Sequence, residues 1–198
     1  MISRKLARKV LCGMLAVGCA SVTGGAFAGS VIGNVTIDNI KTTPTASTGT
    51  FSIGSDSSSN VSIENTGSAI GSSDSDYNGS ILGNEIKLTS QNGCGAIANT
   101  GAHLTIGNDK TDKITITSGD DGIRAIQGYV SLNANEVSID CKAEAGSAAI
   151  WLQNNTQDKD APVNPASVTI KAEKIDLRGN EFGVVAYSNG QLTLNGDT

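Results

Sequence analysis

Residues 113–135 read KITITSGDDGIRAIQGYVSLNAN. The runs ITI and VSL alternate apolar and polar residues, which is typical of β-strands that bury one face. Between them lies a small-residue unit of the form G-x-x-A, Gly122–Ala125. Such a unit fits a tightly curved wall, where a bulky side chain would have no room. The stretch therefore predicts two strands joined through a narrow segment of small residues.

The same three-part pattern occurs in three further segments, which begin at Glu85, Glu136 and Lys174. Each has an alternating first strand, a G-x-x-A unit and an alternating closing strand. The interval between the last two segments is the longest, because a polar insertion at 154–165 interrupts the third. The three further G-x-x-A units are Gly95–Ala98, Gly146–Ala149 and Gly183–Ala186.

Three short strands in each repeat predict an all-β fold, a right-handed parallel β-helix. We expect about five coils, stacked about 4.8 Å apart, with equivalent Ile, Val and Leu residues in internal ladders. The repeats cover 60–198 and are expected to continue beyond the C-terminus. Fainter copies upstream place an irregular region or a first coil at 29–59. An all-β sandwich is the competing fold, but it would not explain why the G-x-x-A unit recurs in register with both strands.

Residues 1–28 have the three parts of a secretory signal peptide. A basic start, MISRKLARK, precedes an apolar run and a small-x-small ending, which predicts cleavage between Ala28 and Gly29. The apolar run is short for a membrane span. A lipoprotein signal, with Cys19 as the lipidated residue, is the alternative. Both interpretations predict an exported protein.

The charge of the chain argues against binding nucleic acid by bulk electrostatics. Its formal net charge is −5, and removal of the basic signal segment would make the rest more acidic. A chain of this kind repels polyanions. Its 24 glycines disfavour helix interiors and suit short strands joined by turns.

The pattern K-I-T-I-x-x-x-D-D-G-I-x-A…V-x-L-x-A at 113–134, behind a signal peptide, resembles the passenger domain of bacterial autotransporters, which are type V secreted proteins. The resemblance covers 1–28 and about 60–198. It implies a non-enzymatic protein at the cell surface, in the outer membrane or outside the cell, that acts in adhesion or surface interaction. It also implies a host or bacterial surface ligand, glycans included, and an outer-membrane barrel in a C-terminal part beyond these residues. No residue with a catalytic or cofactor-binding role is carried over with it.

The paired acids Asp120 and Asp121 favour an alternative, a carbohydrate-active or carbohydrate-binding protein with a pectin-lyase-like β-helix. Polygalacturonase-like enzymes use a similar pair, and an inverting glycosidase needs two carboxyl groups about 6.5–9.5 Å apart. Trp151 could stack on a sugar or anchor the insertion. The companion motifs of those enzymes are missing, however, and His103 falls on the outward phase of a strand. We therefore expect the pair to form a turn and His103 to lie at the surface.

Residues 74–85, DSDYNGSILGNE, match the spacing of a calcium loop. Asp74, Asp76 and Asn78 would supply oxygen ligands, and Glu85 would close the shell. The repeat argues against that role for Glu85, because the equivalent slot holds Lys113 in the next segment. What remains is a weak calcium candidate at the three loop residues, and no other metal site is predicted.

Two cysteines, Cys94 and Cys141, remain after removal of the signal segment, too few for a disulfide framework. Cys141 continues the inward phase of its strand and is expected in the core. Cys94 lies in a turn two coils away, beyond the Cα separation of roughly 7 Å that a disulfide can span. We expect both to be unpaired.

Overall fold

The computed structural model describes residues 20–21, 29–31, 35–37, 49–54, 60–72, 77–143, 146–154 and 165–196. Its strands form three sheets, A, B and C, each named with its strands in spatial order. Sheet A contains β1 (Ala20–Ser21), β3 (Val35–Ile37), β5 (Asn60–Asn65), β8 (Glu85–Ser90), β11 (Lys113–Ser118), β14 (Glu136–Cys141) and β17 (Lys174–Arg178). Sheet B contains β2 (Gly29–Val31), β4 (Gly49–Gly54), β7 (Tyr77–Leu82), β10 (His103–Gly107), β13 (Tyr129–Asn133), β16 (Ser167–Lys171) and β19 (Gln191–Asn195). Sheet C contains β6 (Ile70–Ser72), β9 (Ala96–Asn99), β12 (Ile123–Ile126), β15 (Ala148–Gln153) and β18 (Phe182–Tyr187).

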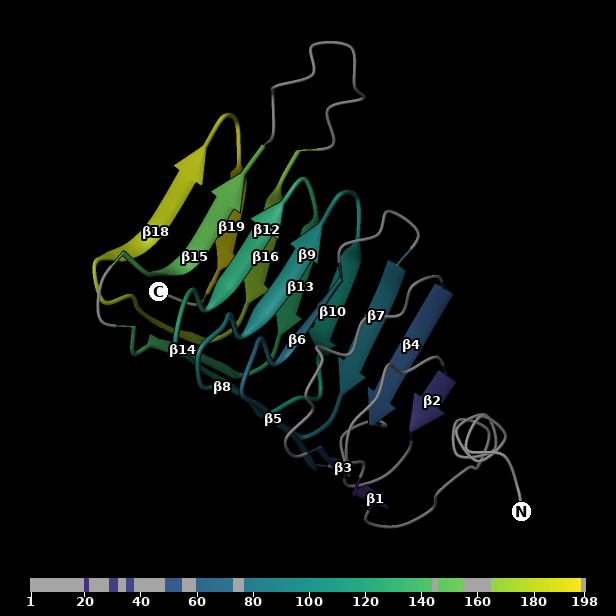
Figure 1. The fold of residues 1–198 in the computed structure, drawn as a ribbon. Helices are drawn as coiled ribbons and strands as arrows, with labels where there is room; N and C mark the ends of the chain where they lie inside the picture. Colours follow the sequence, from purple (N-terminus) through teal and green to yellow (C-terminus); the bar gives the residue numbers. More distant parts are fainter. Residues whose placement is uncertain are drawn as a thin grey trace.

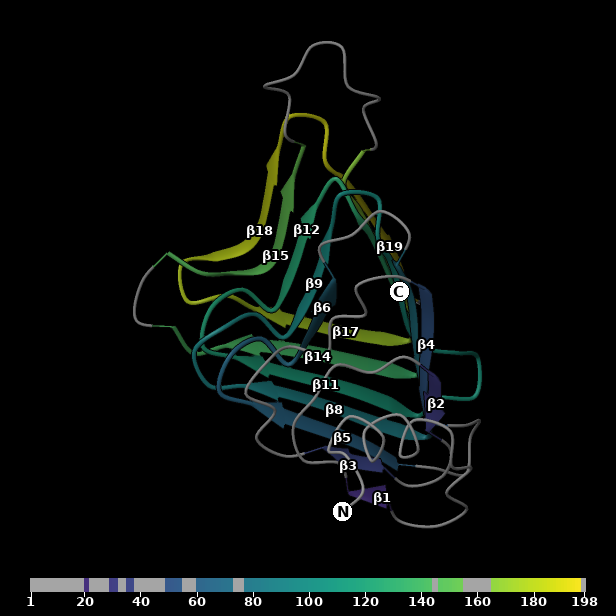
Figure 2. The same ribbon diagram turned by 45° about the vertical axis from the view of Figure 1, so that its right-hand side comes forward.

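The molecule is a parallel β-solenoid with three walls. Every strand pair within the three sheets is parallel, and neighbours in a sheet are strands from successive coils. Figure 2 shows the sheets as three walls around a common interior. From β5 onward each coil contributes one strand to each wall, and the stack from β5 to β17 makes about four turns. The prediction of an all-β parallel solenoid with three strands per coil is confirmed, and the sandwich alternative is wrong.

The predicted repeat register holds in sheet A. Lys113 pairs with Glu85 of the preceding coil and with Glu136 of the following coil, and Glu136 pairs with Lys174. The closing strands in sheet B also stack as predicted, with Leu104 opposite Val130. The strands on either side of the long interval keep this register, as the prediction of an insertion required.

The third G-x-x-A unit was predicted at the wrong residues. Gly95–Ala98 and Gly122–Ala125 stack in register, but Ala125 pairs with Leu152 and Ile123 with Ile150. The unit in the third segment is therefore Ala149–Leu152, three residues later than the predicted Gly146–Ala149. The turn after β14 is longer than its counterparts and absorbs the difference.

A steric contact explains why the wall of sheet C needs small residues. A Cβ at Gly95 would lie 2.1 Å from Cγ2 of Ile116, and one at Gly122 would lie 2.2 Å from Cγ2 of Ile139. Each glycine thus packs against the γ2 methyl of an isoleucine in the first strand of the next coil. Ala149 occupies the same column, and there the following coil provides Leu177, which has no γ2 methyl.

Some described strands lie upstream of the clear repeats. Val35 of β3 pairs with Val61 of β5, and β4 pairs along its length with β7, so the fainter copies do extend the solenoid. β1 falls within the segment predicted as a signal peptide, and β2 starts at Gly29, the first residue after the predicted cleavage site. The remaining residues of 1–28, Cys19 and Ala28 among them, lie outside the described residues.

Inward-facing residues form the predicted internal ladders. In the middle coils Ile86, Ile114 and Val137 stack in one column and are at most 1% exposed. Burial of such side chains contributes about 1.5–3 kcal/mol each. Cys141 is buried in this core, as predicted. In the last coil the inward Val184 and Leu194 are 40% and 46% exposed.

The outer faces of sheets A and B carry different side chains, ion pairs on sheet A and stacked rings on sheet B. On sheet A, Glu136 Oε1 lies 3.1 Å from Lys113 Nζ and 3.3 Å from Lys174 Nζ, so charges alternate from coil to coil. These exposed pairs add little to stability, because solvent screens them. On sheet B, exposed His103 stacks on Tyr129 with ring centroids 4.3 Å apart, which confirms its predicted surface position.

The predicted insertion leaves the wall at Asn154, which is 3% exposed. Its side-chain oxygen accepts a hydrogen bond from the Ala166 N–H, so one residue ties the two ends of the insertion together. Residues 155–164 lie outside the described residues. Among the residues that the structure describes, no helix has the length and apolar character to cross a membrane.

Candidate functional site

The two candidate acids lie in the turn between β11 and β12, at the corner where sheets A and C meet. Both carboxylates bind the guanidinium of Arg124, which projects outward from β12. Arg124 Nη2 donates to Asp120 Oδ2 over 2.9 Å, and Arg124 Nε donates to Asp121 Oδ2 over 2.8 Å. One arginine therefore joins the two acids, and the turn that the sequence predicts is confirmed.

Asp121 is the buried member of this cluster, with a side chain 1% exposed. Its second oxygen, Oδ1, accepts a hydrogen bond of 2.9 Å from the backbone N–H of Ala148 in the next coil. Asp121 thus connects the turn of one coil to the wall of the following coil. Burial raises the pKa of this carboxyl above its ordinary value, while the hydrogen bonds from Ala148 and Arg124 oppose that shift.

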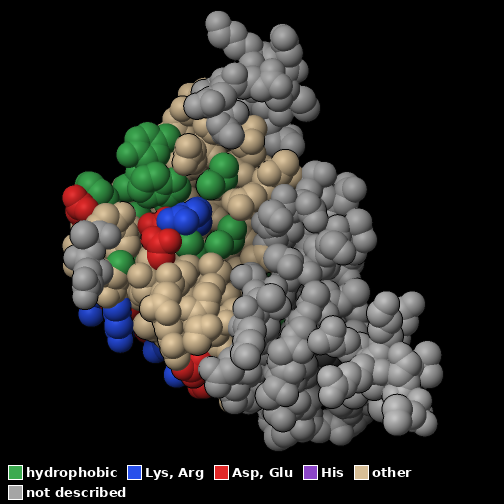
Figure 3. Space-filling model, in the orientation of Figure 1, with side chains coloured by type: hydrophobic (Ala, Val, Ile, Leu, Met, Phe, Trp, Pro, Cys, Tyr) green, Lys and Arg blue, Asp and Glu red, His purple; other side chains and the backbone are tan. Residues whose placement is uncertain are grey.

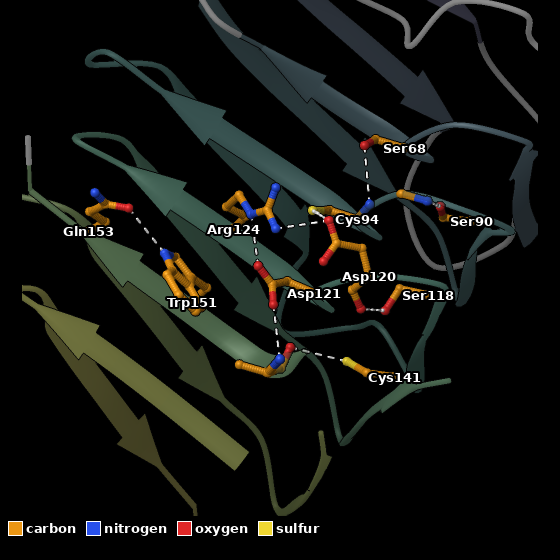
Figure 4. A network of polar contacts seen from close by, with 12 residues as sticks. Ser68, Ser90, Cys94, Ser118, Asp120, Asp121, Arg124, Cys141, Trp151 and Gln153 are labelled. Atoms are coloured by element: carbon orange, nitrogen blue, oxygen red, sulfur yellow. Dashed lines mark hydrogen bonds and ion pairs between the residues drawn. The ribbon is translucent and has the colours of Figure 1, made fainter. Parts of the chain in front are cut away.

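Cys94 brings a third group to the corner from the preceding coil. Its Sγ lies 3.7 Å from Asp120 Oδ2, and its backbone N–H donates to Ser68 Oγ over 3.2 Å. Figure 4 shows these side chains converging between the strands. Burial raises the pKa of the Cys94 thiol to about 12, which the nearby Arg124 charge opposes. The thiol is therefore protonated at physiological pH.

The burial of both thiols leads to a labelling prediction. Cys94 and Cys141 are free and buried, and burial raises the pKa of each. Since the thiolate is the reactive form, neither should be alkylated in the folded protein at pH 8. Mass spectrometry after a short iodoacetamide pulse should find both thiols unmodified, and both modified when the pulse is given in urea. Rapid labelling of Cys94 in the folded protein would contradict this geometry.

Cys94, Asp120 and Asp121 could in principle share an ion, because their nearest ligand atoms lie within 4.8 Å of one another. Arg124 already places a positive charge between the two carboxylates. A metal would have to displace the guanidinium, and it would meet a protonated thiol. The arrangement fits an internal ion cluster better than a metal centre.

The same geometry bears on acid–base chemistry. The nearest carboxylate oxygens of Asp120 and Asp121 lie within 4.8 Å of each other, and Arg124 binds both groups. Asp120 is 37% exposed, whereas Asp121 is enclosed and bonded on both oxygens. The pair can hold an arginine and a backbone amide, and Asp121 lacks the access that a polysaccharide substrate would need.

Titration of Asp121 should be visible in the stability of the protein. Because burial raises its folded-state pKa, the folded protein holds this proton more tightly than the unfolded chain does. Its contribution to stability is therefore full below the ordinary carboxyl range. That contribution falls as the pH rises from the unfolded value through the raised folded value. Wild type should lose stability relative to Asp121→Asn across that window, as measured by urea unfolding from pH 3 to pH 7. A constant difference between the two proteins would contradict the assigned shift.

The calcium candidates are only partly described. Asp74 and Asp76 lie outside the described residues, and Asn78 is an exposed residue of β7 opposite His103. Glu85 begins β8 and pairs with Lys113, which confirms that its slot is an ordinary strand position. The weak calcium site itself stays a prediction.

Trp151 lies on the outer face of sheet C, in the same column as Arg124 and Val185. Its indole N–H donates to Gln153 Oε1 over 3.3 Å, and its ring contacts Tyr187 with centroids 5.2 Å apart and a tilt of 51°. Figure 3 shows hydrophobic side chains gathered over β12, β15 and β18, beside basic and acidic groups. The sequence singled out Trp151 but gave no sign that Tyr187 would lie beside it.

Comparisons with protein-family models, with curated proteins and with solved structures gave no match to this chain.

Proposed function

We propose that this protein is an exported, non-enzymatic β-solenoid displayed at the bacterial cell surface, where it acts in adhesion or another surface interaction. The non-enzymatic part of the proposal is carried by the hydrogen bonds of the two acids. Arg124 binds both Asp120 and Asp121, and the Ala148 amide binds Asp121, so both carboxylates already have structural partners. The exposed aromatic side chains of sheet C support a binding role. The autotransporter passenger type, the right-handed sense of the coils and a barrel partner in a C-terminal part belong to the same proposal.

The shape of the solenoid suits this role. A stack of coils is a stiff rod that presents flat walls and loops along its side. The outer walls described here are chemically distinct, with paired charges on sheet A and apolar side chains on the C-terminal half of sheet C. Such a rod can hold a binding face away from the membrane.

Surface proteolysis tests the proposed display. Intact cells that express the full-length gene are treated with a protease, and the protein is followed by immunoblot beside a periplasmic marker. We expect the protein to be removed while the marker survives. A protein as well protected as the periplasmic marker would show that surface display is wrong.

A second candidate function is carbohydrate binding or cleavage, involving Asp120, Asp121 and Trp151. Trp151 at the surface beside Tyr187 favours binding, whereas the closed state of Asp121 disfavours cleavage. Release of reducing sugars from pectin-type polymers, lost in Asp121→Asn, would support an enzyme. Absence of both release and glycan binding would remove this candidate.

A further inference from the structure

Two outward columns run side by side across sheet C, from β9 to β18. One column contains Ile97, Arg124, Trp151 and Val185, and the other contains Asn99, Ile126, Gln153 and Tyr187. Both columns project to the outside of the solenoid, since the inward Ala125 and Leu152 between them are fully buried. The ring pair Trp151 and Tyr187 thus lies on an outer wall, and we call these two rings with Gln153 and Arg124 the platform.

The platform has two adjoining rings with polar groups at their edge. Gln153 accepts the indole N–H of Trp151, and Tyr187 is 51% exposed. Trp and Tyr offer large contact area at little cost in conformational entropy, because only two torsions have to be fixed. The Asp120–Arg124 ion pair lies on the same face, with both side chains about one-third exposed.

We propose that the platform binds a neutral saccharide. A pyranose ring has an apolar C–H face, which can lie on Trp151 while the tilted Tyr187 ring contacts its edge. Its rim of hydroxyls can bond the Gln153 amide, the Arg124 guanidinium and the Asp120 carboxylate. The proposal deepens the adhesive role proposed above and rests on that role for its biological meaning only. Binding itself is a property of the folded chain.

The Asp120–Arg124 ion pair favours a sugar over a protein as the partner. Aspartate is depleted in protein–protein interfaces, and covering the Asp120–Arg124 pair with apolar side chains would cost desolvation energy. Saccharide hydroxyls can bond those charges without removing them from a polar environment. The two acids exceed the single arginine in charge, and the chain is acidic overall, so a polyuronate is disfavoured.

Titration calorimetry of the purified chain with cellohexaose, chitohexaose and mannohexaose tests the proposal, with oligogalacturonate as the anionic probe. We expect at least one neutral hexaose to bind and oligogalacturonate to bind at least tenfold more weakly. Trp151→Ala and Tyr187→Ala should each weaken binding at least tenfold. Tyr129→Ala, which removes an aromatic ring from the outer face of sheet B, should leave binding unchanged.

Far-UV circular dichroism and thermal unfolding establish that each variant is folded, and the highly exposed Tyr187 provides a test should Trp151→Ala fail to fold. Binding of none of the neutral hexaoses overturns the proposal, as does binding that survives in both folded variants. If no saccharide binds but Trp151→Ala abolishes attachment to cells, the face docks a protein and the saccharide assignment is wrong. Since the titration uses purified protein, its result is independent of where the protein is located, which proteolysis of intact cells measures separately.

Discussion

Replacing Gly122 by alanine is expected to destabilise the protein by about 1–3 kcal/mol, the usual cost of overpacking a core. The new Cβ would lie 2.2 Å from Cγ2 of Ile139 and 2.6 Å from the backbone oxygen of Ala149. The second of these atoms belongs to the next coil's wall and cannot rotate away. Urea unfolding monitored by circular dichroism measures the change in free energy.

Gly183 provides a matched control, because it occupies the same column of sheet C in the last described coil. A Cβ at Gly183 meets nothing within 4 Å. Gly183→Ala should therefore be neutral, or stabilising by about 0.4–1 kcal/mol through the unfolded state. Equal losses in the two variants would mean that the column is not stacked as described.

Asp121→Ala is the second change with a large expected effect, a loss of about 2–4 kcal/mol in the free energy of unfolding. The substitution removes a carboxylate that is 1% exposed and leaves the buried N–H of Ala148 without its acceptor. Arg124 would keep only Asp120 as a partner. Chemical unfolding at pH 7 measures the loss.

Asp120→Ala is the matched control for this change. Asp120 pairs with the same guanidinium but is 37% exposed, so its removal should cost no more than about 1 kcal/mol. If the cluster is structural, Asp121→Ala should lower the free energy of unfolding much more than Asp120→Ala does. If both substitutions leave stability unchanged, the acids are not the structural partners described here.

Hydrophobic alternation was sufficient to predict the strands of sheets A and B. Runs such as Ile114–Ile116 bury one face, and a shift of one residue would expose the whole set, so their register is strongly specified by sequence. Sheet C was harder to predict. Gly146–Ala149 matches the small-residue unit by composition, but register there is set by burying Ile150 beneath Ile123, with Trp151 outside.

The candidate site was predictable only in part. Asp120 and Asp121 were correctly placed in a turn, because other coils hold unrelated residues at those positions. The role of Arg124 was not predicted. Its contacts arise because the turn before β12 brings the Asp120 and Asp121 side chains back toward this strand. Cys94 joins from a different coil, and its approach to Asp120 follows from stacking rather than from any local motif.

Both the acid cluster and the platform depend on the stacking register of sheet C. Paired cysteines test it directly in a background in which the four natural cysteines, Cys12, Cys19, Cys94 and Cys141, are replaced by alanine. Ile126 pairs with Gln153 across neighbouring strands, and adjacent strands about 4.8 Å apart lie within the Cα range of a disulfide. The Ile126→Cys/Gln153→Cys variant should oxidise to an intramolecular disulfide, detected as a mass loss and a mobility shift. Ile126→Cys/Ile150→Cys, the pairing that the predicted Gly146–Ala149 unit requires, should remain reduced. A disulfide in the second variant and none in the first would contradict the fold described here.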